Sequence, residues 1–256
     1  MGEPLAGKHA LITGGGTGIG AAIAHTLARA GAAISLAGRR SAPLEEVAAA
    51  LPQARAIVAD VTREADTAAM ADAARKAHGP IDILVANAGS AESAPVAQID
   101  LGHWLRMLDV NLTGAFLSVK ATLPDLARPE ATANRIVFIA STAALKGYPY
   151  AAAYCAAKHG VVGLARALAV ELAPRGVTVN AVCPGFTETP LLVAALTNIV
   201  AKTGRTHLQA SSELERLNPQ HRFMKPEEVA STVLWLCTPA AQAITGQAIS
   251  VSGGEV

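Results

Sequence analysis

Tyr154 and Lys158 are the residues of this sequence whose types and spacing point most directly to proton transfer. They are four positions apart in an alanine-rich stretch, so on a helix both side chains project from one face. A phenol normally titrates near pH ~10, but a nearby ammonium group favours the phenolate and lowers the phenol pKa. Such a tyrosine can donate a proton to a carbonyl oxygen or remove one from an alcohol. The same spacing also suits an ordinary surface pair, so the pair alone leaves both interpretations open.

A glycine-rich loop suggests a second chemical role, the binding of a pyrophosphate. The short run at residues 9–13 leads into Gly14-Gly15-Gly16-Thr17-Gly18-Ile19-Gly20, where helical spacing begins. Glycines let the backbone turn tightly and approach a phosphate, whose charge then faces free amides at the helix N-terminus. A plain strand-to-helix turn is the alternative. The order of strand, loop and helix favours a dinucleotide site.

The elements that position these residues follow from the spacing of apolar side chains. Short apolar runs predict seven strands, at residues 9–13, 33–37, 54–59, 81–86, 135–140, 177–182 and 248–251. Helical spacing lies between them, at residues 19–30, 64–78, 101–126, 151–172 and 226–237. This alternation predicts a Rossmann-type α/β fold, with a doubly wound, parallel, seven-stranded sheet flanked by helices on both faces. Ligands bind such sheets at the carboxyl ends of the strands.

The length and composition fit a single domain over residues 1–256, because 51% of the residues are apolar and no linker or repeat interrupts the pattern. Residues 190–220 are too long and too polar for a simple connection, so we predict a mobile, partly helical substrate lid. Apolar residues with helical spacing in this segment could cover an acyl group or pack in the core. They are Leu191, Leu192, Leu196, Ile199 and Val200.

Charge and composition argue against several classes of partner. The 21 basic and 20 acidic residues nearly cancel and form no basic stripe, so no nucleic-acid partner is expected. No membrane partner is expected either, because there is no run of ~18 apolar residues. The absence of this run and of a signal-peptide pattern predicts a cytoplasmic protein. The histidines and cysteines lack metal-ligand spacing, so no metal is expected. Cys155, Cys183 and Cys237 are predicted to be buried free thiols.

The spacing Thr13-Gly14-x-x-x-Gly18-x-Gly20 resembles that of the short-chain dehydrogenase/reductase family, and the resemblance covers nearly the whole chain. Further motifs of that family follow in order: Asp60-Val61, Asn87-Ala88-Gly89, Asn111, Ser141, Tyr154, Lys158, and Pro184-Gly185 through Thr189.

The resemblance implies a catalytic tetrad of Asn111, Ser141, Tyr154 and Lys158. In that tetrad Ser141 polarises the reacting oxygen, Lys158 also bonds the nicotinamide ribose, and Asn111 anchors a water that links Lys158 to solvent. Asp60 and Val61 would meet the adenine, Asn87 would steady the central strand, and residues 184–189 would contact the nicotinamide. The implied cofactor contacts are Gly14, Thr17, Gly18, Ile19, Gly20, Arg39, Arg40, Asp60, Val61, Asn87, Ala88, Gly89, Tyr154, Lys158, Pro184, Gly185, Thr187 and Thr189.

The residues after the second predicted strand indicate which nicotinamide cofactor is used. An acidic side chain there would accept the ribose hydroxyls of NAD, but this chain has Gly38, Arg39 and Arg40. Guanidinium groups grip a phosphate with paired hydrogen bonds, so we predict that NADP(H) is preferred and that NAD(H) is possible. Both arginines could instead be solvated charges at a helix start. Thr17 stands where the family's other NADP mark, a basic residue in the glycine loop, would be.

Residues 154–160 and 184–190 look like those of 3-oxoacyl thioester reductases and polyketide ketoreductases in the family. This predicts hydride transfer between NADP(H) and a small-molecule carbonyl or secondary alcohol, with a 3-oxoacyl or 3-hydroxyacyl thioester as substrate. Arg175 matches a basic position that meets an acyl carrier protein, but its partner position is Thr132, so a CoA thioester fits at least as well.

Two alternatives remain at this point. One is an NAD-dependent dehydrogenase of a secondary alcohol or diol. The other is a non-catalytic module that senses NADP. The predicted helices at 101–126 and 151–172 are apolar around much of their circumference, and together with the resemblance they imply a homotetramer.

Overall fold

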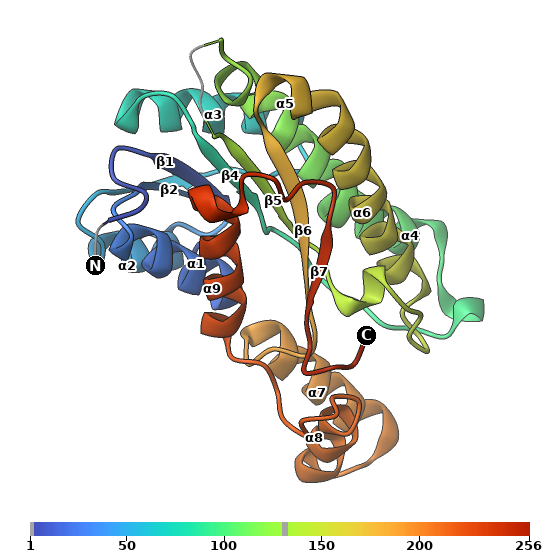
Figure 1. Ribbon diagram of the computed structural model, residues 1–256. Coiled ribbons are helices and arrows are strands. Elements are labelled where there is room, and N and C mark those ends of the chain that lie inside the picture. Colours follow the sequence, from blue (N-terminus) through green and yellow to red (C-terminus); the bar gives the residue numbers. More distant parts are fainter. Residues whose placement is uncertain (1–2, 130–132) are drawn as a thin grey trace.

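The centre of the structure is a seven-stranded sheet in which every pair of neighbouring strands is parallel. The computed structural model describes residues 3–129 and 133–256. The strand order is β3-β2-β1-β4-β5-β6-β7 (Figure 1). The strands are β1 (His9–Thr13), β2 (Ala33–Gly38), β3 (Ala54–Val58), β4 (Ile83–Ala86), β5 (Arg135–Ile139), β6 (Thr178–Pro184) and β7 (Ala248–Val251). The predicted seven strands and their parallel arrangement are confirmed.

Helices cover both faces of this sheet, as a doubly wound fold requires (Figure 1). One face carries α1 (Gly18–Arg29), α2 (Ser41–Ala49) and α9 (Pro226–Cys237). The other carries α3 (Glu64–His78), α5 (Gly114–Leu126) and α6 (Ala152–Leu172), with α4 (Leu101–Leu108) beside α6. The order of the strands reverses between β1 and β4, which is the position where such folds bind ligands.

The core explains why these strands are continuous apolar runs. Strands β1, β4, β5 and β6 are buried along their whole length, so both faces of each strand need apolar side chains. Leu11, Leu84 and Phe138 pack toward α3, α5 and α6, whereas Ile12 and Val85 pack toward α1 and α9. This two-sided packing gives the loops at the carboxyl ends of the strands a rigid base.

Two helical predictions differ from the structure. The predicted helix at residues 101–126 is divided by a π-helical turn, η2 (Asp109–Thr113), and such turns are frequent at functional sites. Helix α2 was not predicted, because it is short and carries a proline. Pro43 lies in its first turn, where a helix has no need of that amide hydrogen.

The segment predicted as a lid forms two helices, α7 (Pro190–Thr203) and α8 (His207–Glu215). Figure 1 shows both beyond the ends of β6 and β7, apart from the helices that cover the sheet. Leu192 and Leu196 are buried with Ala210 in an apolar cluster of their own. These two leucines therefore pack between α7 and α8, whereas Leu191 is 44% exposed.

Across residues 3–129 and 133–256, no helix combines the length and apolar character needed to cross a membrane. The three cysteines are all free thiols. Cys183 and Cys237 are buried, as predicted, but Cys155 is partly exposed.

Candidate active site

Lys158 is the charged residue of the predicted tetrad, and it is buried. It is 4% exposed, and its Nζ atom donates a hydrogen bond of 2.9 Å to the carbonyl oxygen of Ile139, the last residue of β5. Burial lowers the pKa of Lys158 from 10.5 to about 8, because the protein interior disfavours the ammonium form. The Nζ atom lies 5.7 Å from the centre of the Tyr154 ring. The sequence prediction that these two side chains share one helix face is confirmed.

Tyr154 lies close enough to the side chain of Ser141 for that hydroxyl to influence its pKa, and Ser141 is the second residue after β5. The Ser141 Oγ atom also accepts from the backbone amide of Ala143 at 3.1 Å, so its orientation is set at the start of a short 3-10 turn, η3 (Thr142–Ala144). Burial raises the pKa of Tyr154 to about 12, and the neighbouring Ser141 hydroxyl offsets part of this rise.

This pKa differs from the sequence expectation, in which Lys158 lowers the pKa of Tyr154. The reason is that burial dominates for Tyr154, while the Lys158 ammonium is bonded to the Ile139 carbonyl. Without a bound cofactor, the protein therefore keeps Tyr154 protonated at neutral pH.

Asn111 lies in the π-helical turn η2 and is 2% exposed. Its Nδ2 atom donates to the carbonyl oxygens of Met107 at 3.0 Å and Ser90 at 2.9 Å, and its Oδ1 atom accepts from the Ser90 amide at 3.3 Å. The π turn makes this possible, since it frees the Met107 carbonyl from the regular helical pattern. Asn111 thus connects the helix to the loop after β4.

Gly89 marks the place where Asn111 and Lys158 converge. A Cβ atom on Gly89 would lie 2.7 Å from Asn111 Oδ1 and 3.6 Å from Lys158 Nζ. The first distance is too short for any side chain, so glycine is required here by close packing. The structure thereby brings all four predicted tetrad residues to one region beyond β4 and β5.

The glycine loop follows β1 and turns sharply into α1. Gly14 and Gly18 have φ values of +66° and +55°, which favour glycine. A Cβ atom on Gly20 would lie 2.3 Å from the Gly14 carbonyl oxygen. The first turn of α1, which includes Ile19, has no side-chain cap after Thr17 and no acidic residue. Its free amides are therefore suited to an anion.

Asn87 and Ala88 join the ends of β4 and β1. Their amides both donate to Thr13 Oγ1, at 3.0 and 3.1 Å, and Asn87 Nδ2 donates to the Thr13 carbonyl at 2.9 Å. In the sequence Thr13 is only part of the glycine-loop motif, and its role as the shared acceptor depends on β1 and β4 lying side by side. Asn87 holds the strand ends together, as the resemblance implied.

Asp60 and Val61 lie after β3 at the same edge of the sheet. Asp60 Oδ1 accepts from the amide and hydroxyl of Thr62, and these bonds, with the charges of Arg39 and Arg63, lower the pKa of Asp60. Val61 is 5% exposed, and its Cγ2 atom would lie 2.6 Å from a Cβ atom on Gly114.

Arg39 and Arg40 are exposed after β2, and Arg40 is the N-cap residue of α2. The first turn of α2 has neither a side-chain cap nor an acidic residue. The position of these arginines is therefore compatible with both interpretations, a phosphate contact and a solvated charge. They lie at the start of α2, and they also follow β2 at the carboxyl edge of the sheet, where the glycine loop follows β1.

The segment after β6 is held by hydrogen bonds within itself and to β7. Pro184 ends β6, the Gly185 amide donates to the Val251 carbonyl at 3.0 Å, and Thr187 Oγ1 donates to the Gly185 carbonyl at 2.9 Å. Thr189 Oγ1 accepts from the Leu192 amide at 3.4 Å and so caps α7. This segment leads directly from the site to α7.

Sequence reasoning missed a polar cluster below this site. Tyr148 donates a hydrogen bond to Glu255, and Lys146 Nζ lies 2.9 Å from the same carboxylate. Glu255 is more than 100 positions from Tyr148 in the chain, so no local pattern could have revealed the contact.

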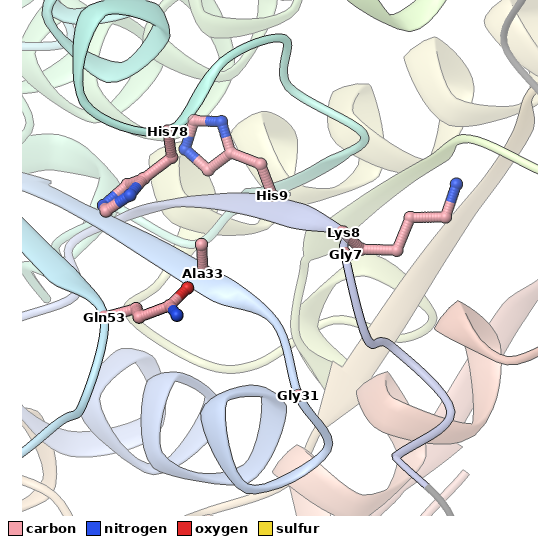
Figure 2. Close-up of a pocket in the computed structure, with 7 residues that line it drawn as sticks. All are labelled: Gly7, Lys8, His9, Gly31, Ala33, Gln53 and His78. Atoms are coloured by element: carbon pink, nitrogen blue, oxygen red, sulfur yellow. The ribbon is translucent and has the colours of Figure 1, made fainter.

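A separate shallow depression lies at the opposite edge of the sheet, where β1 and β2 begin (Figure 2). It is lined by residues that include His9, Ala33, Gln53 and His78. None of the predicted site residues lies there.

Comparison with known proteins agrees with this geometry. Residues 14–255 match a family model described as enoyl-(acyl carrier protein) reductase. The chain is 39% identical to the cis-4-hydroxycyclohexanecarboxylate dehydrogenase of Sinomonas cyclohexanicum, with 99% of this chain and 98% of that protein covered.

Two solved structures are also similar. An actinorhodin polyketide ketoreductase with NADPH is 36% identical with a TM-score of 0.93, covering 100% of this chain and 99% of that one. A 3-ketoacyl-(acyl-carrier-protein) reductase from Brucella melitensis, complexed with NADH, is 34% identical with a TM-score of 0.88, covering 98% and 99%. On these grounds the chain belongs to the short-chain dehydrogenase/reductase family of oxidoreductases.

Proposed function

We propose that this oxidoreductase interconverts a carbonyl and a secondary alcohol, with Tyr154 as the proton donor and acceptor. The observation that carries the proposal is that the Tyr154 side chain lies beside both Ser141 and the buried Lys158 ammonium. A proton donor, a second hydroxyl and a cation meet beyond the carboxyl end of β5, which is where parallel sheets bind substrates.

Each tetrad residue has a proposed part in proton transfer. Tyr154 is protonated near neutral pH and can donate to a carbonyl oxygen, while the Ser141 hydroxyl can bond the same oxygen. Lys158 remains charged at pH 7, since its pKa is about 8, and its charge stabilises the phenolate left after donation. Asn111 holds the loop after β4 against this group. In oxidation the phenolate would take the proton from the alcohol.

The residues present fit a nicotinamide dinucleotide. The glycine loop and the uncapped first turn of α1 offer amides to a pyrophosphate. We assign Asp60 and Val61 to the adenine and residues 184–189 to the nicotinamide. The assignment is supported by the positions of these segments after β3 and β6, at the same edge of the sheet as the glycine loop and Asn87 to Gly89. When bound, the nicotinamide supplies or accepts the hydride.

NADP(H) is the proposed cofactor of choice. Arg39 and Arg40 are exposed at the uncapped start of α2, so two guanidinium groups and free amides could meet a 2'-phosphate. The polyketide ketoreductase structure contains NADPH, whereas the Brucella reductase structure contains NADH. NAD(H) therefore remains the alternative cofactor.

A 3-oxoacyl or 3-hydroxyacyl thioester is the proposed substrate, in line with the names of the two structural neighbours. We favour a CoA thioester over a carrier protein. Arg175 lies between α6 and β6, at the end of α6 away from Tyr154, so its position gives no support to a carrier contact close to Tyr154. Thr132, the other position considered, lies outside the described residues.

Helices α7 and α8 are proposed to act as the substrate lid of one domain spanning residues 1–256. Asn198 Nδ2 and Lys202 Nζ of α7 each donate to Ser93, at 3.1 Å, in the loop after β4. These bonds connect the lid to the loop that Asn111 anchors. Opening the lid would require both bonds to break, and both are exposed, so the barrier would be low.

An NAD-dependent dehydrogenase of a secondary alcohol is the second candidate function. It is favoured by the 39% identity to a dehydrogenase of a hydroxylated cyclohexane carboxylate. A non-catalytic NADP-sensing module is disfavoured, because such a module would not need the four tetrad residues at one place.

We also propose that the enzyme works as a cytoplasmic homotetramer. Helices α4, α5 and α6 carry exposed apolar side chains, including Trp104, Phe116 and Val170, that a second copy could cover. Light scattering that showed a monomer would contradict the assembly.

The first test of the proposed function is the absorbance of reduced nicotinamide with acetoacetyl-CoA, comparing NADPH with NADH. We expect loss of absorbance with NADPH, and a fall of about 10³-fold in kcat for Tyr154→Phe. A gain of absorbance with NAD+ and a hydroxy acid, without any loss of NADPH absorbance with the thioester, would favour the second candidate. Cofactor binding without turnover on a broad panel of carbonyls and alcohols would overturn the catalytic proposal.

A further inference from the structure

Glu255, in the segment after β7, has a carboxylate buried against the segment after β5 that carries Ser141 and Tyr148. Its side chain is 1% exposed, although the residue follows an edge strand. It accepts a hydrogen bond from the Tyr148 hydroxyl and forms an ion pair of 2.9 Å with Lys146 Nζ. Figure 1 shows the end of the chain beside the yellow-green segment that follows β5.

Tyr148 connects this carboxylate to the residue next to Ser141. The Tyr148 hydroxyl lies 2.6 Å from Thr142 Oγ1. An ionised carboxylate has no proton to give, so Tyr148 must donate to Glu255, and Thr142 must then donate to Tyr148. The result is a directed chain of hydrogen bonds from Thr142 through Tyr148 to Glu255.

The same carboxylate also touches the other strand end of the site. A Cβ atom on Gly185 would lie 3.1 Å from Glu255 Oε2, so the carboxylate lies against the turn after β6. The Phe186 ring meets the edge of Tyr148, with ring centres 6.0 Å apart. Glu255 therefore joins the loop after β5, which carries Ser141, to the loop after β6.

A buried carboxylate is a costly way to anchor a chain segment. Apolar side chains of similar volume can stabilise a fold as well as a buried ion pair does. The charge fixes the direction of the hydrogen bonds, because the Tyr148 hydroxyl must donate to Glu255 and the Thr142 hydroxyl must then donate to Tyr148. Burial and the neighbouring carboxylate also raise the pKa of Tyr148, so this hydroxyl stays a donor over the working pH range.

We propose that Glu255 is a positioning residue for catalysis, which acts through Tyr148 and Thr142 to hold Ser141 in place against Tyr154. The inference rests on the proposed function of Ser141 and Tyr154. It assigns to Glu255 no contact with substrate or cofactor.

The test uses Tyr148→Phe and Glu255→Ala, with Val256→Ala as the matched control. Tyr148→Phe removes only the hydroxyl and keeps the ring against Phe186, while Val256 is the exposed neighbour of Glu255. We expect kcat to fall about 10-fold in both test variants, because small misplacements of catalytic groups have effects of this size or larger. The KM for NADPH should stay within about 2-fold of the wild-type value. The control should match the wild type.

The pH profile gives a readout that a merely structural role would not move. The Ser141 hydroxyl lowers the pKa of Tyr154, so displacing that hydroxyl should shift the Tyr154 limb of the profile to higher pH. The limb should shift in the same direction in Ser141→Ala. In the Ser141→Ala background, Glu255→Ala should have an effect below about 2-fold, because both changes then act on the same interaction.

These outcomes separate the inference from the proposed function. A wild-type enzyme that turns over, with unchanged kcat and pH profile in folded Tyr148→Phe and Glu255→Ala, would overturn the positioning role and leave the function standing. If the wild type showed no turnover, hydrogen exchange of residues 141–148 would decide. Equal protection in Glu255→Ala and Val256→Ala would then overturn it, and a selective loss in Glu255→Ala would support it.

Discussion

Lys158 Nζ donates to the carbonyl oxygen of Ile139 at 2.9 Å, so the ammonium is attached to the end of β5 as well as facing the Tyr154 ring. This single bond fixes the position of the cation relative to the sheet. It also explains how a lysine that is 4% exposed can remain charged near neutral pH, since one of its protons has a buried acceptor.

Replacing Lys158 with methionine should change how stability depends on pH. The pKa of Lys158 falls from 10.5 to about 8 on folding, so the native state disfavours the bound proton. The resulting penalty is complete below pH 8 and disappears as the pH rises toward 10.5. Lys158→Met should therefore gain in melting temperature relative to the wild type at pH 7, and this gain should shrink at pH 9.5.

The control for this measurement is Lys120→Met, because that lysine is 59% exposed. The lost donor to Ile139 affects Lys158→Met equally at both pH values, so the change with pH is the diagnostic quantity. A difference in melting temperature that stayed constant from pH 7 to 9.5 would contradict the prediction.

Arg39→Asp should reverse the cofactor preference. The carboxylate would repel a 2'-phosphate and could accept the ribose hydroxyls of NAD instead. We expect kcat/KM for NADPH to fall about 10- to 100-fold, the range of one charge-assisted hydrogen bond, while kcat/KM for NADH rises. Arg63→Ala, which removes another charge near Asp60, serves as the control and should leave the ratio unchanged. An unaltered ratio in Arg39→Asp would show that Arg39 is only a solvated charge.

Gly89→Ala should reduce turnover, whereas Gly163→Ala should not. The new methyl group at position 89 would lie 2.7 Å from Asn111 Oδ1 and must displace that side chain, while nothing lies within 4 Å of the same atom at position 163. We expect kcat to fall about 10-fold or more for Gly89→Ala. Gly163 is inside α6, so its replacement should stabilise the protein by about 0.5–1 kcal/mol. Equal kcat values in the two variants, measured with the same substrate, would argue against a role for Asn111.

Acid should destabilise the protein through the histidines at the opposite edge of the sheet. His9 is 2% exposed and bonded to Ser35, and its ring meets the edge of His78 with centres 5.2 Å apart (Figure 2). Burial lowers the pKa of both below 6.5, so their contribution to stability is present above pH 6.5 and is lost as the pH falls. Denaturant unfolding at pH 7.5 and 5.0 should show a smaller loss of stability in His9→Gln than in the wild type. The exposed His207→Gln should behave as the wild type does, and a similar loss in all three proteins would exclude His9 as the source.

The sequence alone was sufficient for the strands, most helices and the main site motifs. The apolar run before Gly14 predicted β1, and the alanine-rich stretch around Tyr154 and Lys158 predicted α6. Both are local patterns, because backbone periodicity acts over a few residues. Even the position of the site could be anticipated, since Ser141 and Asn87 both follow predicted strands. Helix α2 and the π turn at Asn111 were not anticipated, because their signals are short or depend on one extra residue in a turn.

Only the tertiary structure decided how these groups are tuned. The pKa of Tyr154 is raised rather than lowered, because burial dominates and the Lys158 ammonium donates its hydrogen bond to Ile139. The contact of Glu255 with Tyr148 joins residues 107 positions apart, and it exists only because β7 runs beside β6 and ends next to the catalytic loop. Burial and long-range pairing depend on how the whole chain packs, whereas sequence patterns report only on neighbours along it.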